Sequence, residues 1–372
     1  MSFAPILDQL PPALSPALRR FSGLISPNDD AGFETMAQEA RELTRQHFGR
    51  TMRMFAPLYL SNECINNCRY CGFSRDNPIL RVTLSLEQVL AEARHLSAQG
   101  FRQVLLVAGE HPKFVGEHYL VDCIRALRPL FSSIALELGP LETAEYLPLV
   151  IAGADGLIVY QETYDRAIYA EMHTAGPKRD FTWRLDCAQR AYAAGFRRLG
   201  IGALFGLSPW RKEALALAQH LEFLLKNCWQ ADLTVSLPRL RPAAGEFTPP
   251  FSLGDRALAQ LICAFRICFP QVGIVLSTRE AAPLRDALAS LGVTSMSAGS
   301  HTEPGGYTGQ GKGELHRTVR GRVLPPEEIG DAIATGQFQI SDSRSPAEVA
   351  TVLRAHGLEP VWKDWDQALL AQ

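Results

Sequence analysis

Three cysteines in the stretch "SNECINNCRYCGF" (residues 61–73) are the residues of this chain whose spacing most clearly predicts chemistry. Cys64, Cys68 and Cys71 follow one another as C-x3-C-x2-C. A structural zinc site is usually closed by four ligands, and an iron–sulfur cube normally takes four thiolates, one for each iron. Three thiolates leave one iron of a cube with an open coordination position. A substrate or cofactor that carries an amino and a carboxylate group could chelate there.

Two other interpretations of these cysteines stay open on spacing alone. A zinc ion could combine the three thiolates with an imidazole from elsewhere in the chain, and the thiols could instead be redox-active. The spacing favours the iron–sulfur cluster over both. The histidines that could complete a zinc site are His111, His173 and His301. The other five cysteines stand in apolar or helical contexts and are interpreted as small buried side chains: Cys123, Cys187, Cys228, Cys263 and Cys268.

Composition limits the class of protein. The chain has 372 residues, of which 47% are hydrophobic, and a formal net charge of -2. This charge argues against a general nucleic-acid-binding surface. No run of about 20 apolar residues predicts a membrane span, and the N-terminus "MSFAPILDQLPPAL" lacks the pattern of a secretory signal. We therefore expect a cytoplasmic protein, in which most cysteines remain thiols.

Short apolar runs alternate with helical patterns along most of the chain, and this alternation predicts an α/β fold. Eight strands joined by helical crossovers are typical of a parallel (β/α)8 TIM-type barrel, which needs about 250 residues. A doubly wound open sheet is the structural alternative. We expect a helical extension over 1–50, the barrel over 51–300, and a Gly-rich segment with a tail over 301–372. The predicted strands are 54–60, 103–108, 133–138, 156–160, 198–204, 232–237, 272–277 and 293–298.

Polar residues follow the predicted strands, at the end of a barrel where active sites form. One such residue alone is typical of a cap or a rim. Together they predict a charged site at one mouth of the barrel. They are Gly109 and Glu110 after the second strand, Glu137 at the end of the third, Glu162 after the fourth, Arg239 and Arg241 after the sixth, and Ser277 and Arg279 after the seventh.

The C-x3-C-x2-C motif, with the aromatic Tyr70 before its last cysteine, resembles the signature of the radical S-adenosylmethionine superfamily. Over nearly its whole length the chain is similar to the 2-iminoacetate synthases, the tyrosine lyases of thiamine biosynthesis. The segments that carry this resemblance are "YLSNECINNCRYCGF", "VYQETY", "WRL", "GIGALFGL", "LPRLRPA", "LSTRE", "TSMSAGSHTEPGGY" and "PVWKDWDQAL". The last two are the most particular to that family.

The resemblance implies which residues bind the cofactors. Cys64, Cys68 and Cys71 would hold a [4Fe–4S] cluster whose fourth iron binds S-adenosyl-L-methionine. Gly109 and Glu110 would lie near the methionine amino group, and Glu162 near the ribose hydroxyls. Arg184 would bind the methionine carboxylate, to which a guanidinium is well matched. Gly202, in "GIGALFGL", would lie beside the adenine.

The resemblance also implies the reaction. L-tyrosine would lose a hydrogen from its amino group to a 5′-deoxyadenosyl radical, and its Cα–Cβ bond would break to give 2-iminoacetate (dehydroglycine) and p-cresol, alongside methionine and 5′-deoxyadenosine. Arg239 and Ser277 are favoured to hold the substrate carboxylate, with Arg241 and Arg279 as neighbouring candidates. A general base should keep the substrate amine neutral, and Glu137 is a candidate.

The resemblance also implies two kinds of protein partner. A thiazole synthase would consume the imine, and a flavodoxin or ferredoxin would donate the electron. Lys178 with Arg179, or Arg197 with Arg198, could face that acidic donor, or could be ordinary solvated charges.

Three alternative functions are a tryptophan lyase, the tyrosine lyase that matures iron-only hydrogenase, and a non-catalytic zinc-binding scaffold. The hydrogenase maturase carries C-terminal cysteines, whereas no cysteine follows Cys268 here. The Gly-rich stretch 305–321 is predicted to close over the barrel mouth when ligands bind, because its glycines permit hinging.

Overall fold

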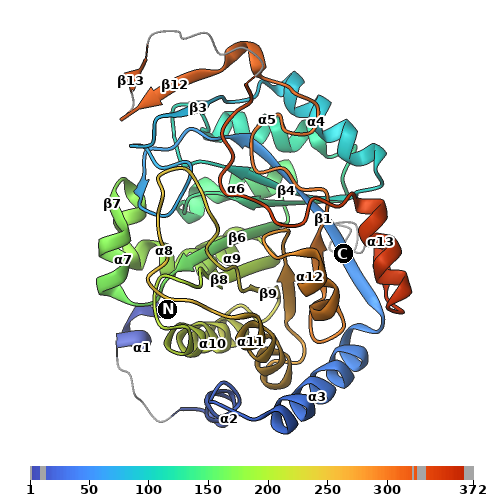
Figure 1. Ribbon diagram of the computed structural model, residues 1–372. Coiled ribbons are helices and arrows are strands. Elements are labelled where there is room, and N and C mark those ends of the chain that lie inside the picture. Colours follow the sequence, from blue (N-terminus) through green and yellow to red (C-terminus); the bar gives the residue numbers. More distant parts are fainter. Residues whose placement is uncertain (1, 9–13, 321, 325–331, 364–372) are drawn as a thin grey trace.

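Eight parallel strands of this chain close into a barrel, as Figure 1 shows for the computed structural model. The structure describes residues 2–8, 14–320, 322–324 and 332–363. The barrel strands are β1 (Thr51–Ser61), β4 (Gln103–Ala108), β5 (Ser133–Glu137), β6 (Gly156–Glu162), β8 (Arg198–Ala203), β9 (Asp232–Ser236), β10 (Gly273–Leu276) and β11 (Ser295–Ser297). Pairing of β11 with β1, from Arg53↔Ser295 to Phe55↔Ser297, closes the ring. All eight predicted strands are therefore confirmed, and the open-sheet alternative is wrong.

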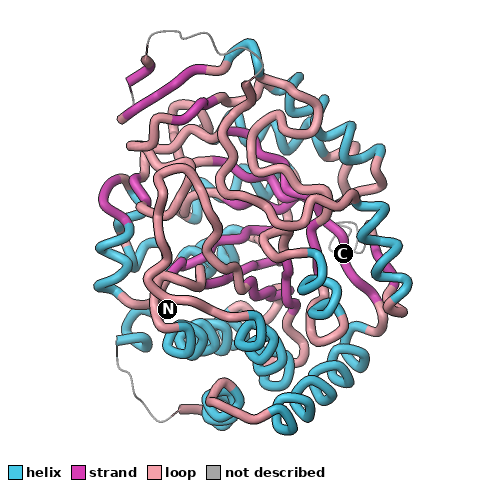
Figure 2. The backbone as a smooth tube through the Cα atoms, viewed as in Figure 1, coloured by secondary structure: helices cyan, strands magenta, loops and turns pink. Residues whose placement is uncertain are grey.

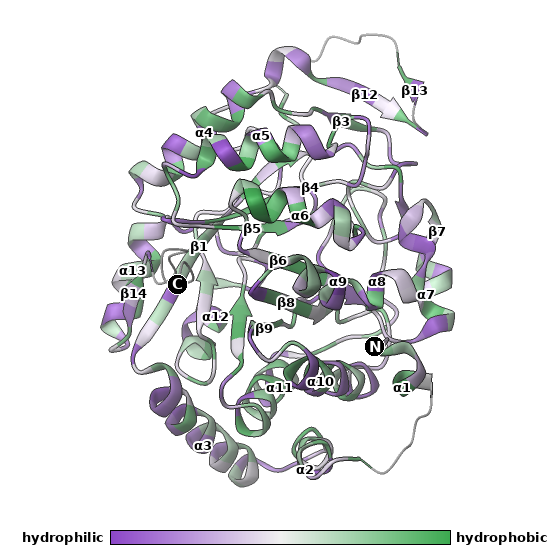
Figure 3. Cartoon of the chain, turned by 180° about the vertical axis from the view of Figure 1, so that it is seen from behind, coloured by the Kyte–Doolittle hydropathy of each residue, from purple (hydrophilic) through white to green (hydrophobic). Residues whose placement is uncertain are grey.

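Helices surround the barrel, so that each buries one face against the strands (Figure 2). Those that follow barrel strands are α4 (Leu86–Ala98), α5 (Glu117–Leu127), α6 (Thr143–Ala152), α7 (Arg166–Met172), α8 (Phe181–Leu185), α9 (Cys187–Ala194), α10 (Trp210–Asn227), α11 (Asp255–Cys268) and α12 (Ala282–Ala289). Short 3-10 turns lie at Pro177–Arg179 and Lys312–Glu314. Figure 3 shows purple and green alternating along α3, the pattern of a helix with one solvent-exposed and one packed face.

The predicted N-terminal helical extension is present as α1 (Ala4–Asp8), α2 (Pro16–Leu24) and α3 (Asp30–Phe48). The side chain of Asp29 caps α3 by accepting a hydrogen bond from the amide of Gly32 at 2.8 Å. Gly49 ends the helix with a φ of 65°, a conformation that suits glycine. Helix α3 packs against α11, and α2 packs against α10 and α11, so the extension covers one side of the barrel.

The C-terminal part adds two small sheet extensions. Strands β12 (His316–Val319) and β13 (Arg322–Val323) pair antiparallel with each other, and β12 pairs with β3 (Ile79–Arg81). Residues 316–319 of the Gly-rich segment are therefore a strand with two partner strands. Helix α13 (Pro346–Ala355) leads to β14 (Glu359–Val361), which pairs with the start of β1. The end of "PVWKDWDQAL" lies outside the described residues.

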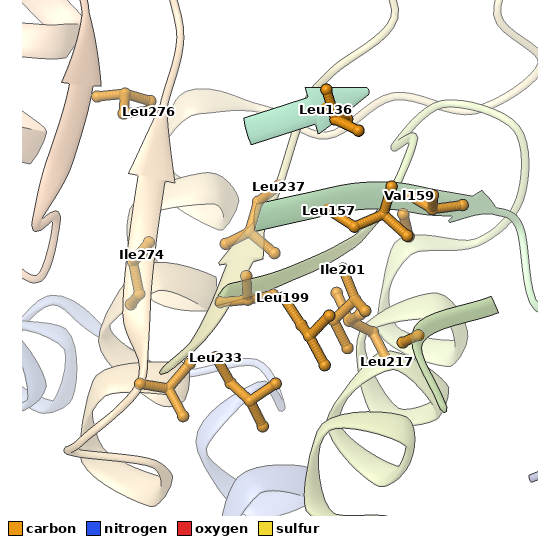
Figure 4. Packing of buried hydrophobic residues seen from close by; sticks show 14 of the residues in the cluster. Leu136, Leu157, Val159, Leu199, Ile201, Leu217, Leu233, Leu237, Ile274 and Leu276 are labelled. Atoms are coloured by element: carbon orange, nitrogen blue, oxygen red, sulfur yellow. The ribbon is translucent and has the colours of Figure 1, made fainter. Parts of the chain in front are cut away.

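Alternation along the strands divides their side chains between two environments. Figure 4 shows one set, in which Leu157 and Val159 of β6, Leu199 and Ile201 of β8 and Leu217 of α10 belong to the apolar core. The opposite set faces the barrel axis and is unusual for a barrel, whose interior is commonly filled by bulky branched residues. Here it includes glycines, serines and charged side chains and leaves room for cavities.

No helix in the described parts of the chain is long and apolar enough to cross a membrane.

Candidate active site

The three cysteines of the motif line one cavity at the C-terminal ends of the strands. Cys68 is buried, and Cys64 and Cys71 are partly buried. They belong to the loop after β1, where the short strand β2 (Asn67–Cys68) pairs with β7 (His173–Ala175). Among the described residues, no three His, Cys, Asp or Glu side chains converge closely enough to enclose one metal ion. The thiols instead share a wall of this cavity.

Arg81 stabilises the cysteine loop from beneath. Its guanidinium is buried and donates to the carbonyl oxygens of Asn62 (2.6 Å), Phe73 (3.1 Å) and Ser74 (2.8 Å). An irregular loop has backbone carbonyls that no strand or helix satisfies, and Arg81 supplies their donors. The amide of Asn77 adds bonds to the carbonyls of Cys71 and Gly72, both at 3.1 Å. The sequence thus fixes the backbone that carries the thiols.

Gly109 and Glu110 follow β4 and line the same cavity. A Cβ atom on Gly109 would lie 2.2 Å from the carbonyl oxygen of Glu63, so only glycine fits there. The carboxylate of Glu110 accepts a hydrogen bond from the Asn66 amide at 2.6 Å. The backbone amide of Ile65 donates to the Glu110 carbonyl at 2.9 Å. These contacts join the end of β4 to the cysteine loop. Both therefore lie at the same mouth of the barrel, where the sequence analysis expected polar residues to gather.

Glu162, Lys178 and Arg184 form a buried charged group that lines the same cavity. Glu162 has a φ of 71°, uncommon for a non-glycine residue, at an irregularity in the pairing of β6 with β8. Its Oε1 atom lies 2.6 Å from the Lys178 Nζ and 3.3 Å from an Arg184 guanidinium nitrogen. Arg184 also donates from Nε to the Tyr160 carbonyl at 2.7 Å. Burial alone would raise the pKa of Glu162, but the two cations hold it below its ordinary value.

The donor set fits an iron–sulfur cluster. Burial raises the pKa of all three thiols, and Lys178 opposes this rise for Cys68 and Cys71. A metal would replace the thiol protons, because thiolates are the ligands. Lys178 and Arg184 would then offset part of the negative charge of three thiolates in a site of low polarity.

A second cavity adjoins the first. Both are lined by Val107, Glu137 and Tyr160. Ser277 and Arg279, which follow β10, line the second cavity only, and the Arg279 guanidinium lies 3.3 Å from the centre of the Phe338 ring. Burial raises the pKa of Glu137 to about 7, although Arg279 opposes it. This carboxyl group is therefore poised to exchange a proton near neutral pH.

Two predicted substrate arginines lie elsewhere. Arg239 donates from Nε to both carboxylate oxygens of Glu280, at 3.0 and 3.1 Å, and from NH1 to Asp255 at 2.7 Å. Arg241 donates to the Ser341 hydroxyl. Neither lines the two cavities. Both arginines lie in the loop beyond the end of β9, where the alternation of a strand no longer sets side-chain direction, so the residue type alone could not tell whether either faces inward.

Three other candidate residues lie in surroundings that the sequence did not indicate. Gly202 does not line the cysteine cavity, because the Tyr160 ring occupies the space over it, only 2.8 Å from where a Cβ would stand. Lys178 does not face outward toward a donor protein, since its ammonium is buried against Glu162. Arg198 lies at the opposite end of the barrel, beside Ser133 and Asp155.

A strap formed by residues 335–342 covers the mouth. Its backbone exchanges hydrogen bonds with the loops after β1, β9, β10 and β11: Gly72 donates to Gln337, Gln337 to Thr302, Gln339 to Pro242, and Ser341 to Thr278. Residues 305–308 pack instead against α4, where Glu92 accepts from the amides of Tyr307 and Thr308. The strap covers the mouth in this structure, and closure of the stretch 305–321 on ligand binding stays a prediction.

Sequence reasoning missed Lys178, Tyr160 and the strap. Tyr160 and Lys178 carried one usable signal each, since Tyr160 shares one face of a predicted strand with Ile158, and Lys178 stands six residues before Arg184 in a turn-rich segment. The strap had none, because its irregular sequence shows no periodicity.

Comparison with known proteins places the chain. Residues 58–218 match the radical SAM superfamily, and residues 236–359 match the Biotin and Thiamin Synthesis associated domain. The chain is 43% identical to 2-iminoacetate synthase of Escherichia coli (strain K12) over 347 residues, which cover 93% of this chain and 86% of that protein.

Solved structures of similar proteins have the same fold. The FeFe-hydrogenase maturase HydG from Carboxydothermus hydrogenoformans superposes with a TM-score of 0.82 and 34% identity, over 97% of this chain and 80% of that one. Methylornithine synthase (PylB) shares the fold, with a TM-score of 0.72 at 20% identity over 98% of this chain and 99% of that one. The chain therefore belongs to the 2-iminoacetate synthase family of the radical SAM superfamily, whose enzymes use a [4Fe–4S] cluster and S-adenosylmethionine.

Proposed function

We propose that this enzyme cleaves the Cα–Cβ bond of L-tyrosine to 2-iminoacetate and p-cresol, with methionine and 5′-deoxyadenosine as co-products, and so supplies the imine for the thiazole of thiamine. The observation that carries the proposal is the 43% identity, over 93% of the chain, to a protein named 2-iminoacetate synthase. The joined cavities support it, because one carries three thiols and the other a buried arginine.

The cofactor residues are assigned from the first cavity. Cys64, Cys68 and Cys71 hold the cluster, and Gly109 with Glu110 accommodates the methionine amino group. When bound, the cluster and S-adenosylmethionine supply the radical that takes a hydrogen atom from the substrate. Arg184 offers a guanidinium to the methionine carboxylate, and Glu162 offers an ionised carboxylate to the ribose hydroxyls. Lys178 fixes Glu162 in that position.

The substrate carboxylate is assigned to Arg279 and Ser277. Arg279 lines the second cavity, and its guanidinium is fixed in place by the Phe338 ring. Arg239, the residue favoured from the sequence, already forms ion pairs with the carboxylates of Asp255 and Glu280, which neutralise its charge. A tyrosine held by Arg279 has its amino group close to the residues that line both cavities.

Glu137 is the proposed general base. It stands on the shared wall, and a pKa of about 7 leaves it partly ionised at neutral pH. It can therefore take the ammonium proton of the substrate and leave the amine neutral before hydrogen abstraction.

We further propose a cytoplasmic location, a flavodoxin or ferredoxin as the electron donor, and a thiazole synthase as the partner that receives the imine. The physical reason for the partner is that an imine hydrolyses readily in water, so direct transfer protects it.

An anaerobic assay tests the function. Reconstituted enzyme is given S-adenosylmethionine and a reductant, with either tyrosine or tryptophan, and 5′-deoxyadenosine, p-cresol and glyoxylate are quantified by mass spectrometry. Equal p-cresol and glyoxylate with tyrosine alone is the expected result. Deoxyadenosine without p-cresol would retain the radical chemistry and reject tyrosine as the substrate, and turnover of tryptophan would establish the alternative lyase.

A further inference from the structure

A row of residues crosses the barrel at the floor of the second cavity. In register, Tyr160 of β6 pairs with Gly202 of β8, Gly202 pairs with Ser236 of β9, and Ser236 pairs with Val275 of β10. Because Gly202 has no side chain, the Tyr160 ring lies over β8 and reaches β9. Its hydroxyl donates a hydrogen bond to the Ser236 Oγ atom at 3.3 Å. The row therefore ends in two hydroxyl groups that face the barrel axis.

These hydroxyls lie among apolar side chains at the deep end of the cavity, where the Ser297 hydroxyl, in register with Phe55, already accepts a hydrogen bond from the Thr278 amide. Phe55, Leu105 and Val275 line the cavity at its deep end, where it meets a third cavity below. Ser236 is 6% exposed, and within the described part of the chain its Oγ has Tyr160 as its hydrogen-bond partner. Since Oγ accepts from Tyr160, its own proton remains available to an acceptor in the cavity.

The depth of this floor matches one amino acid. Ser236 is level with Val275, and Ser277 lies two residues further along the same strand toward the mouth. Two strand residues span about 6.6 Å, and Arg279 follows Ser277 by two more residues, so a carboxylate bound by Arg279 above Ser277 leaves room for the side chain to extend toward Ser236. A substrate whose carboxylate is held by Ser277 and Arg279 would place its aromatic ring along the apolar walls and its para position at the floor.

We propose that Ser236, positioned by Tyr160, reads the phenol hydroxyl of the substrate and so selects tyrosine over other aromatic amino acids. This inference rests on the proposed function and extends it to specificity. Phenylalanine would fill the same walls but leave the Ser236 proton without an acceptor. The bicyclic indole of tryptophan is wider and presents no hydroxyl at that point. The selectivity over phenylalanine is modest, because Ser236 and Tyr160 still satisfy each other when the phenol is absent.

Another buried hydroxyl, that of Ser300, is an alternative contact for the substrate. Ser300, after β11, lines the cavity, is 4% exposed and has no hydrogen-bond partner within the described residues. It follows the end of its strand, at the level of the mouth, where the amino acid head group lies. If Ser300 contacts the substrate, its loss weakens tyrosine and phenylalanine equally.

The test is a comparison of binding, without turnover. Reconstituted enzyme with S-adenosylhomocysteine in place of S-adenosylmethionine is titrated anaerobically with tyrosine and with phenylalanine by calorimetry. Ser236→Ala should weaken tyrosine about 3- to 10-fold, the loss expected of one neutral hydrogen bond, and leave phenylalanine unchanged. Unchanged phenylalanine binding also shows that the variant is folded. Thr234→Val is the matched control, since it removes a hydroxyl from the same strand in the cavity below, and it should alter neither affinity.

The outcomes separate this inference from the function. If Ser236→Ala prefers tyrosine over phenylalanine as strongly as the wild type does, the role of Ser236 is rejected. The proposed function is then unaffected, provided that the wild type forms p-cresol. Loss of preference in Ser300→Ala instead would place the phenol at the mouth and reject the role of Ser236 as well. Absence of p-cresol from wild-type enzyme would reject the proposed function, and the inference with it.

Discussion

The Nζ atom of Lys178 lies 2.6 Å from the Oε1 atom of Glu162, on a wall of the cavity that also carries the three thiols. The two side chains are only 13% and 9% exposed. An ion pair so deeply buried is stabilising only while both partners are present, since either charge alone would be costly. Arg184 shares the same carboxylate, so one anion holds two cations beside the proposed cluster.

Lys178→Met should destabilise the apoprotein by about 1.5–3 kcal/mol at pH 7, the loss of one charge-assisted hydrogen bond, because Arg184 remains as a partner of the Glu162 carboxylate. The loss should shrink as pH falls, because the cations depress the pKa of Glu162, and a protonated Glu162 no longer needs them. Urea denaturation from pH 7 to pH 4 measures this. Arg179→Met is the control, because Arg179 is the exposed neighbour. An equal loss at all pH values would contradict the coupling.

Glu137→Gln should raise the stability of the apoprotein at pH 8 and leave it unchanged near pH 4. The folded protein raises the pKa of Glu137 to about 7, so folding favours the protonated form, and stability falls as pH rises from the ordinary carboxyl value through that pKa. The gain at pH 8 is at most about 3 kcal/mol. Thermal unfolding at the two pH values measures it. If Glu137 is also the base, tyrosine cleavage by the wild type rises with pH through about 7, and the variant loses this rise.

The sequence predicted the barrel well because its signals are local. Each strand, such as 156–160, is an apolar run bounded by helical patterns, and the cysteine spacing lies within one loop. The direction of a side chain at a strand end is not local. Arg239 and Arg279 follow their strands by a few residues each, but Arg239 turns to Glu280 while Arg279 enters the cavity.

Long-range packing explains the other omissions. Lys178 becomes an active-site residue only because β7 pairs with β2 and brings the following turn over Glu162. The same reasoning applies to the strap, whose partners Gly72 and Thr278 are separated from it by more than 50 residues. Such contacts follow from closure of the barrel, which a periodicity argument does not describe.

Cys68→Ala should abolish assembly of an intact cluster. Cys68 is a buried member of the motif, so no other described thiol can replace it at that wall. The measurement is iron and sulfide content after anaerobic reconstitution, with electron paramagnetic resonance of the reduced protein. Cys268→Ala is the control, because Cys268 ends helix α11 outside the barrel. A full cube in Cys68→Ala would reject the ligand assignment.

Arg279→Met should weaken tyrosine binding at least 10-fold, since a charge-assisted hydrogen bond to a carboxylate contributes about 1.5–3 kcal/mol. Binding of S-adenosylhomocysteine should be unchanged, because Arg279 lines the second cavity only. Arg239→Met should behave in the opposite way. It leaves Glu280, which is 2% exposed, without its main cation and lowers stability. Calorimetry and denaturation separate the two variants, and a greater loss of tyrosine affinity in Arg239→Met would restore the residue favoured by the sequence.

Phe338→Ala should uncouple cofactor cleavage from substrate cleavage. Phe338 belongs to the strap, and its ring covers the Arg279 guanidinium at 3.3 Å, so its loss admits water to the cavity and loosens the substrate. The ratio of 5′-deoxyadenosine to p-cresol should rise severalfold, while cluster content stays at the wild-type level. Ile333→Ala serves as the control, since Ile333 precedes the strap and is 51% exposed. An unchanged ratio in Phe338→Ala would mean that the strap does not seal the mouth, and that another segment must exclude water during turnover.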